Sequence, residues 1–228
     1  MIDKTIKNRI ANDWQSNFPE LTIYSLNKFY KIAGCVIFGI ELIKLPRNDE
    51  YRPHFVIYPL WKKNLKECLE MPIVMQQFCN KRNFQFDIPY EYSKHVFYFE
   101  EVIKVIKKEC PFLFEEYSLA QSIVDSIDNY SQTKRFSIAP NSYFQAEFLQ
   151  VKMEIVLYKS TFKAQEILNK IKGKGWDIDH FQSCGVNIKE WFSSLQEEID
   201  DRNLFLKQIE INKAESKLKK LKKSDLRF

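Results

Sequence analysis

One stretch of the chain constrains its fold more than any other: residues 28–61, KFYKIAGCVIFGIELIKLPRNDEYRPHFVIYPLW. Two runs rich in β-branched and aromatic residues lie on either side of PRNDE, whose proline, asparagine and aspartate favour a turn. We therefore expect an antiparallel β-hairpin over residues 32–61. The first run is apolar almost throughout, which predicts a central strand that is covered on both faces.

From Pro111 onward the spacing of apolar residues changes to that of helices. One series of steps of four and three residues predicts a long helix over about 141–172; its members are Phe144, Phe148, Val151, Ile155, Tyr158 and Phe162. A second series predicts another long helix over about 188–222, with a shift of register after Leu206. We expect the two helices to pair as an antiparallel helical hairpin with a heptad seam of the coiled-coil type.

These patterns predict an α+β fold. Residues 1–110 would form a body with a small antiparallel sheet and helices, and residues 111–228 a helical region. The chain of 228 residues has 45% hydrophobic residues, which is enough for a sizeable core. Only five glycines occur, which argues against an all-β sandwich and against phosphate-binding glycine loops.

The cysteines and the hydropathy pattern favour a cytoplasmic protein. The five cysteines are odd in number and form no close pair, so reduced and mostly buried thiols are expected. The N-terminus is polar, and no apolar run reaches the roughly 18 residues that a membrane span needs. We expect no membrane partner.

The formal charge of +5 is concentrated at the C-terminus, where residues 207–228 hold eight basic and three acidic residues. Five lysines lie close together there: Lys217, Lys219, Lys220, Lys222 and Lys223. On a helix they would flank Leu218 and Leu221, which could dock on another protein. The same lysines could instead contact the phosphates of a nucleic acid.

One segment collects potential metal ligands within eight residues: Asp177, Asp179, His180 and Cys184. Carboxylate, imidazole and thiolate groups can all bind a transition metal. The spacing matches no standard ligand motif, however, and either aspartate could equally cap a short helix. No catalytic or nucleotide-binding motif occurs, so the sequence favours a non-catalytic role and implies no cofactor.

The leading hypothesis is a cytosolic, non-catalytic subunit or accessory factor that binds another protein through its C-terminal helix and exposed aromatic residues. The expected binding residues are Tyr58, Trp61, Ile211, Leu218 and Leu221. The alternative is a nucleic-acid-binding accessory protein that uses the five C-terminal lysines. The third hypothesis is a metal-dependent enzyme.

Overall fold

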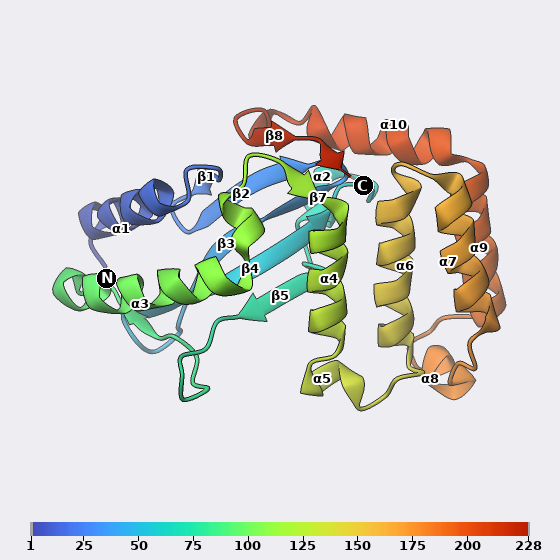
Figure 1. Cartoon of the computed structure of the whole chain (residues 1–228), viewed down its shortest axis with the longest axis horizontal. Helices are drawn as coiled ribbons and strands as arrows, with labels where there is room; N and C mark the ends of the chain where they lie inside the picture. The colour runs from blue at the N-terminus through green and yellow to red at the C-terminus, as the bar shows by residue number, and fades with distance from the viewer. Residues whose placement is uncertain (1, 228) are drawn as a thin grey trace.

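A computed structural model describes residues 2–227 and shows a mixed α+β fold (Figure 1). An antiparallel sheet occupies the N-terminal half and most helices lie in the C-terminal half, with 52% of residues in helices and 19% in strands. The predicted fold class is therefore confirmed. Among the described residues, no helix is both long enough and apolar enough to cross a membrane.

The main sheet follows the order β1-β2-β3-β4-β5, with β6 also pairing with β4 and β8 pairing with β2. Its strands are β1 (Thr22–Ser25), β2 (Lys28–Ala33), β3 (Val36–Lys44), β4 (Glu50–Pro59), β5 (Val74–Gln77), β6 (Ile88–Pro89) and β8 (Lys222–Ser224). The predicted hairpin is present, because β3 and β4 pair antiparallel from Val36 opposite Pro59 to Lys44 opposite Tyr51. A second, two-stranded sheet joins β7 (Ser118–Leu119) to β9 (Leu226–Arg227).

The first arm of the predicted hairpin is interrupted by a tight turn at Gly34 and Cys35, which separates β2 from β3. Gly34 has a φ angle of 54°, in the left-handed region that glycine adopts without strain. A Cβ atom at this position would also lie 2.7 Å from Leu226 and 2.9 Å from Tyr158. The turn therefore needs glycine both for its backbone and for close packing of the C-terminal segment.

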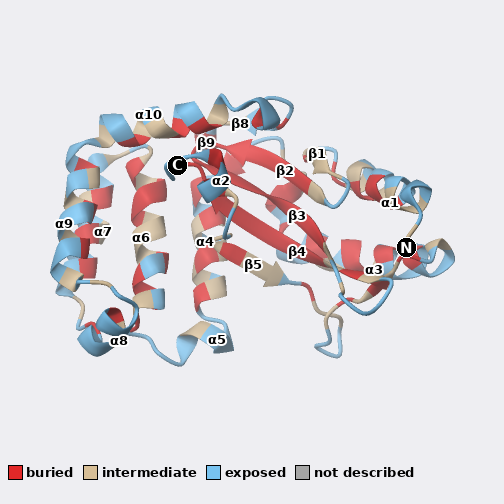
Figure 2. Cartoon of the chain, turned by 180° about the vertical axis from the view of Figure 1, so that it is seen from behind, coloured by how far each residue is buried: buried red, intermediate tan, exposed pale blue. Residues whose placement is uncertain are grey.

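The α-helices are α1 (Lys4–Asn17), α2 (Leu65–Cys68), α3 (Tyr92–Glu109), α4 (Ala120–Ser131), α5 (Lys134–Ser137), α6 (Tyr143–Leu157), α7 (Thr161–Gly173), α8 (Ile178–Ser183), α9 (Ile188–Asp200) and α10 (Arg202–Lys213). Short 3-10 helices form at Pro111–Phe114 (η1) and Ser216–Leu218 (η2). Figures 1 and 2 show α4, α6, α7 and α9 beside the sheet, and α10 running from them back towards it.

Neither of the two predicted long helices is continuous, which corrects the boundaries 141–172 and 188–222. The first divides into α6 and α7 because Ser160 begins a new helix, its hydroxyl accepting a hydrogen bond from the Lys163 amide. Phe144 and Phe162, the ends of the expected seam, are 49% and 72% exposed, so the seam does not extend over its predicted length. The second divides at Asp201, ahead of the register shift in the sequence, and α9 and α10 meet there at a corner.

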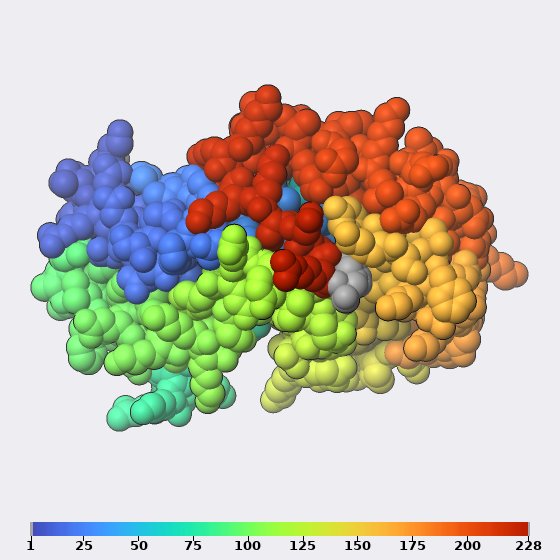
Figure 3. Space-filling model, turned by 45° about the horizontal axis from the view of Figure 1, so that its top comes forward, coloured from blue at the N-terminus to red at the C-terminus, as the bar shows by residue number. Residues whose placement is uncertain are grey.

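The lysine-rich tail is not the end of a helix, which is a second correction. Residues 222–224 form β8 instead, a short strand that pairs in parallel with Lys31–Ala33 of β2. Local spacing could not predict this, because the pairing joins residues almost 200 positions apart in the chain. Figure 3 shows the C-terminal segment, in red, lying between the N-terminal half and the helices.

A chain of buried polar groups joins α1 and α3 to β4 on one face of the sheet. The indole of Trp14 donates to the Tyr51 hydroxyl at 3.0 Å, and that hydroxyl lies 3.0 Å from Nδ1 of His95. Because the Asp13 carboxylate only accepts, Nε2–H of His95 donates to it at 3.2 Å, and in the neutral ring Nδ1 then accepts from the Tyr51 hydroxyl. Burial lowers the pKa of His95, which favours the neutral ring that this chain requires.

Tyr51→Phe should destabilise the fold by about 1–3 kcal/mol, because it leaves the buried Trp14 indole and His95 Nδ1 without partners. Urea denaturation at pH 7 measures the change. Tyr92→Phe is the matched control, since it removes a hydroxyl from a half-buried ring on α3. Equal stability of the two variants would contradict the assigned role of the Tyr51 hydroxyl.

Candidate functional site

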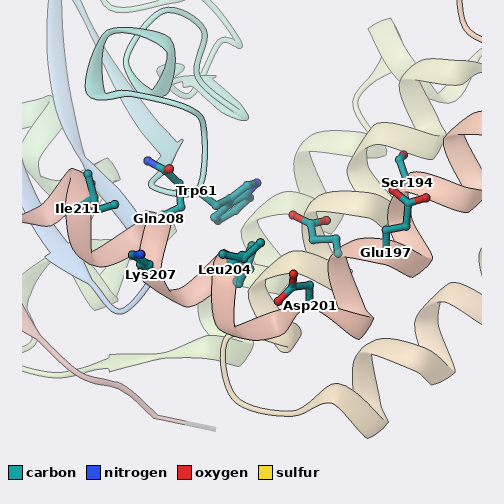
Figure 4. Close-up of a pocket in the computed structure, with 10 residues that line it drawn as sticks. Trp61, Ser194, Glu197, Asp201, Leu204, Lys207, Gln208 and Ile211 are labelled. Atoms are coloured by element: carbon teal, nitrogen blue, oxygen red, sulfur yellow. The ribbon is translucent and has the colours of Figure 1, made fainter.

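A groove of about 680 Å³ lies at the corner where α9 meets α10 (Figure 4). Its walls come from both helices, and the Trp61 ring enters it from the chain that follows β4. The lining residues are Trp61, Ser194, Glu197, Glu198, Asp201, Leu204, Phe205, Lys207, Gln208 and Ile211. The groove is thus built from residues almost 150 positions apart in the sequence.

Arg202 fixes the corner that opens the groove. Its guanidinium donates to the backbone carbonyls of Leu157 and Tyr158, each at 2.7 Å. These carbonyls lie at the C-terminal end of α6, where the helix leaves acceptors unpaired and a cation is favourable. The direction in which α10 leaves α9 is therefore set by the end of α6.

Asn212 attaches α10 to the chain segment that carries Trp61. Its side-chain amide donates to the carbonyls of Leu60 at 2.8 Å and Lys62 at 2.7 Å, and the residue is buried. Gln208 adds a hydrogen bond to the Lys63 carbonyl at 3.1 Å. Trp61 lies between these tethered carbonyls, so its ring has a fixed position against α10.

The groove combines an apolar floor with an acidic wall. The rings of Trp61 and Phe205 pack with their centroids 5.9 Å apart. Leu204 is 60% exposed and Ile211 is 52% exposed on the same helix. Figure 4 shows Asp201 at the corner and Glu197 on α9, on the side of the groove towards which Trp61 extends.

Two further carboxyl groups lie in and beneath this groove. Glu198 lines it, whereas Glu154 of α6 is buried and accepts a hydrogen bond from Gln150 at 2.9 Å. Gln150 in turn accepts from the Trp191 indole at 2.7 Å. Burial, with a smaller contribution from the charge of Glu198, raises the pKa of Glu154 to about 8, and burial raises the pKa of Glu198 to about 7.

The indole nitrogen of Trp61 is buried without a hydrogen-bond partner. Trp61 is 8% exposed, and its N–H lies close enough to the buried Glu154 carboxyl to favour the ionised form of that group. Trp14, Trp176 and Trp191 all donate to protein acceptors. The Trp61 N–H therefore serves the buried Glu154 carboxyl beneath the groove and is not accessible from solvent.

The structure brings together two of the five predicted protein-binding residues, Trp61 and Ile211, in this groove. The other three are buried within the chain. Tyr58 donates to Glu41 at 2.8 Å, and Leu218 and Leu221 pack into the core. These three side chains hold the fold together and are not accessible to a partner.

The five C-terminal lysines are all exposed, although not on a helix face as expected. Lys220 donates to the Tyr24 carbonyl at 2.9 Å, and Lys222 forms an ion pair with Glu20 at 3.3 Å. The remaining three are Lys217, Lys219 and Lys223. None of these three lines the α9–α10 groove.

The predicted metal ligands do not converge. Asp177 caps α8 by accepting from the His180 amide at 3.0 Å, as the alternative interpretation of this segment proposed. Nδ1 of His180 accepts from the Tyr143 amide and lies 3.7 Å from the Cys184 sulfur. Across residues 2–227, no group of three or more histidine, cysteine, aspartate or glutamate residues is arranged to hold a metal ion.

Sequence reasoning missed Glu154, Glu198 and Asn212. A signal existed for Glu154, the one acidic residue among the apolar neighbours of MEIVL in a helix that was expected to be buried. Glu198 and Asn212 lie among charged and polar residues of an amphipathic helix, so nothing local distinguished them. No family model, curated protein or solved structure shows a significant match to the chain.

Glu154→Gln should stabilise the protein more at pH 8.5 than at pH 5.5, by a difference of more than about 1 kcal/mol. The folded-state pKa of Glu154 lies above its ordinary value of 4.5, so its stabilising contribution is complete below pH 4.5 and is lost as the pH rises through about 8. One pKa unit corresponds to about 1.4 kcal/mol. Glutamine keeps the acceptor for Gln150 and avoids the buried charge.

Urea denaturation of the wild type and the variant at both pH values measures this effect. Glu197→Gln, on the exposed side of the same groove, is the control and should change stability equally at the two pH values. A Glu154→Gln variant that gains no more stability at pH 8.5 than at pH 5.5 would contradict the presence of a buried, titrating carboxyl.

Proposed function

We propose that this chain is a non-catalytic, cytosolic subunit or accessory factor of a multiprotein complex, and that it binds its partner in the α9–α10 groove. The observation that carries the proposal is the meeting of Trp61, Leu204 and Ile211 in one groove with an acidic wall. Tryptophan surrounded by apolar side chains in a concave surface is typical of protein-binding sites. The five unpaired cysteine thiols support the cytosolic placement.

The chemistry of the groove specifies its occupant. The acidic residues Glu197, Glu198 and Asp201 form one side, and the apolar side chains form the floor. A partner segment with basic residues along one edge and apolar residues along the other complements both. An amphipathic helix that lies along α10 satisfies this pattern, because Leu204 and Ile211 are seven positions apart and share a helix face.

The alternative, nucleic-acid binding, keeps one supporting observation, the exposure of all five C-terminal lysines. Each lysine that contacts a phosphate releases a counterion, so such binding would weaken steeply with salt. This surface is separate from the groove. The two functions therefore predict different sensitive residues and can be tested in one set of variants.

The test is selection of peptides from a random display library on the immobilised full-length chain. We expect enriched peptides with basic and apolar residues, and their affinity should fall about tenfold or more in Trp61→Ala and in the double variant Leu204→Asp, Ile211→Asp. Loss of a central tryptophan or of apolar contacts has effects of this size at interfaces. Fluorescence anisotropy with labelled peptides measures the affinities.

Ile138→Asp is the matched control, because Ile138 is 77% exposed and lies outside the groove. The proposal would be overturned if selected peptides bound the groove variants and the wild type equally. In parallel, an RNA or DNA oligonucleotide is titrated at several salt concentrations. A steep salt slope that disappears in the triple variant Lys217→Glu, Lys219→Glu, Lys223→Glu would favour the alternative instead.

A further inference from the structure

A second recess, of about 290 Å³, lies far from the α9–α10 groove. It forms where α1, the turn between β1 and β2, strand β3 and the residue after β6 meet. Figure 1 shows α1 and β1 at one end of the long axis of the molecule and α9 at the other. The described residues that line the two sites are entirely different. The volume is near the lower limit for ligand pockets, so the recess suits a small molecule.

The recess has an apolar floor that is formed in the free protein. Ile10 of α1 and Leu42 of β3 are buried core residues, and Leu26 in the turn adds exposed apolar surface. The turn is tied to β3 by two hydrogen bonds. The Leu42 amide donates to the Asn27 carbonyl at 2.8 Å, and the Asn27 side chain donates to the Leu42 carbonyl at 3.5 Å. These bonds fix the spacing of the two walls.

Tyr90 contributes an unpaired hydroxyl to this recess. The residue is 7% exposed, yet its hydroxyl forms no hydrogen bond within residues 2–227. The other buried tyrosines, Tyr30, Tyr51 and Tyr58, all form such bonds. The Tyr90 hydroxyl is not one of the unpaired polar atoms that the protein seals from solvent, so it is reached through the recess that Tyr90 lines. Burial, followed by the charge of Asp49, raises the pKa of Tyr90, which keeps the hydroxyl protonated and able to donate.

Two lysines give the recess a positive charge. Lys7 of α1 is half-buried and forms no ion pair within residues 2–227. Lys44 of β3 is exposed and lies 3.7 Å from the Asp49 carboxylate, which is 71% exposed. An exposed pair of this kind contributes little stability, so Lys44 is available to a ligand. Of the described residues that line the recess, none is acidic.

We propose that this recess binds a small carboxylate that carries an apolar body, such as an arylalkanoate. The apolar body covers the floor, and the carboxylate accepts from the Tyr90 hydroxyl and balances the charges of Lys7 and Lys44. A neutral ligand would leave both ammonium groups without a counter-charge. An anion without an apolar body would leave the floor in contact with water.

Titration of the labelled chain with hydrocinnamate, followed by nuclear magnetic resonance of the Asn27 and Leu42 amides, tests the proposal. We expect saturable shifts of both signals. Binding should be about tenfold or more weaker for hydrocinnamide, which keeps the phenyl ring without the charge, and for acetate, which keeps the charge alone. Equal affinity for hydrocinnamate and either control, or no saturation by hydrocinnamate below about 10 mM, would overturn the proposal.

Two variants test the polar groups. The double variant Lys7→Gln, Lys44→Gln should weaken hydrocinnamate binding about tenfold or more, and Tyr90→Phe about fivefold or more, because each removes a partner of the carboxylate. The double variant Lys170→Gln, Lys189→Gln is the matched control. It makes the same change of net charge at exposed lysines outside the recess and should bind as the wild type does.

A stability measurement separates binding by the Tyr90 hydroxyl from a structural role. Tyr90→Phe should keep the urea midpoint of the wild type, because the hydroxyl has no partner among the described residues. Unchanged affinity for hydrocinnamate in Tyr90→Phe or in the Lys7, Lys44 double variant would contradict the proposal. A lowered urea midpoint of Tyr90→Phe would also contradict it, since the hydroxyl would then be used within the fold.

Discussion

The arrangement of the molecule depends on the hydrogen bonds that the side-chain amide of Asn212 donates. It binds the backbone carbonyls of Leu60 and Lys62 and so attaches the helical region to the end of the central hairpin. Arg202 makes the complementary attachment at the other end of α10, where it caps the final carbonyls of α6. With both ends of α10 fixed, the groove and the Trp61 ring within it have a defined geometry.

This arrangement explains why polar groups accumulate beside Trp61. Three elements meet there, and each contributes a side chain that cannot reach bulk water freely: Glu154 from α6, Glu198 from α9 and Trp61 after β4. Burial favours the neutral carboxyl groups, whereas the Trp61 N–H favours the ionised form of Glu154. The fold thus keeps two carboxyl groups whose ionised forms are disfavoured next to the exposed apolar side chains of Leu204 and Ile211. Such a coincidence is typical of binding sites.

The sequence predicted elements that depend on local pattern and failed where distant contacts decide. The hairpin over residues 32–61 followed from turn residues and β-branched runs, and two of the predicted binding residues, Trp61 and Ile211, line the same groove. The predicted lengths of the two long helices were wrong for two reasons. Ser160 caps a new helix, α7, and Arg202 holds the corner at Asp201 where α9 ends. The lysine tail was assigned to a helix because its pairing with β2 is a contact between the two ends of the chain. The carboxyl pair was missed because its members come from two helices.

A double-mutant cycle tests the central claim most directly, since it isolates the interaction between one protein group and one ligand group. The cycle combines Leu204→Ala in the protein with replacement by alanine, one at a time, of the apolar residues of a selected peptide that binds the groove. If the peptide lies along α10, at least one of these residues should be coupled to Leu204 by about 1 kcal/mol or more. Changes that add to within about 0.3 kcal/mol for every apolar residue of the peptide would contradict the claim that a partner segment binds in the α9–α10 groove.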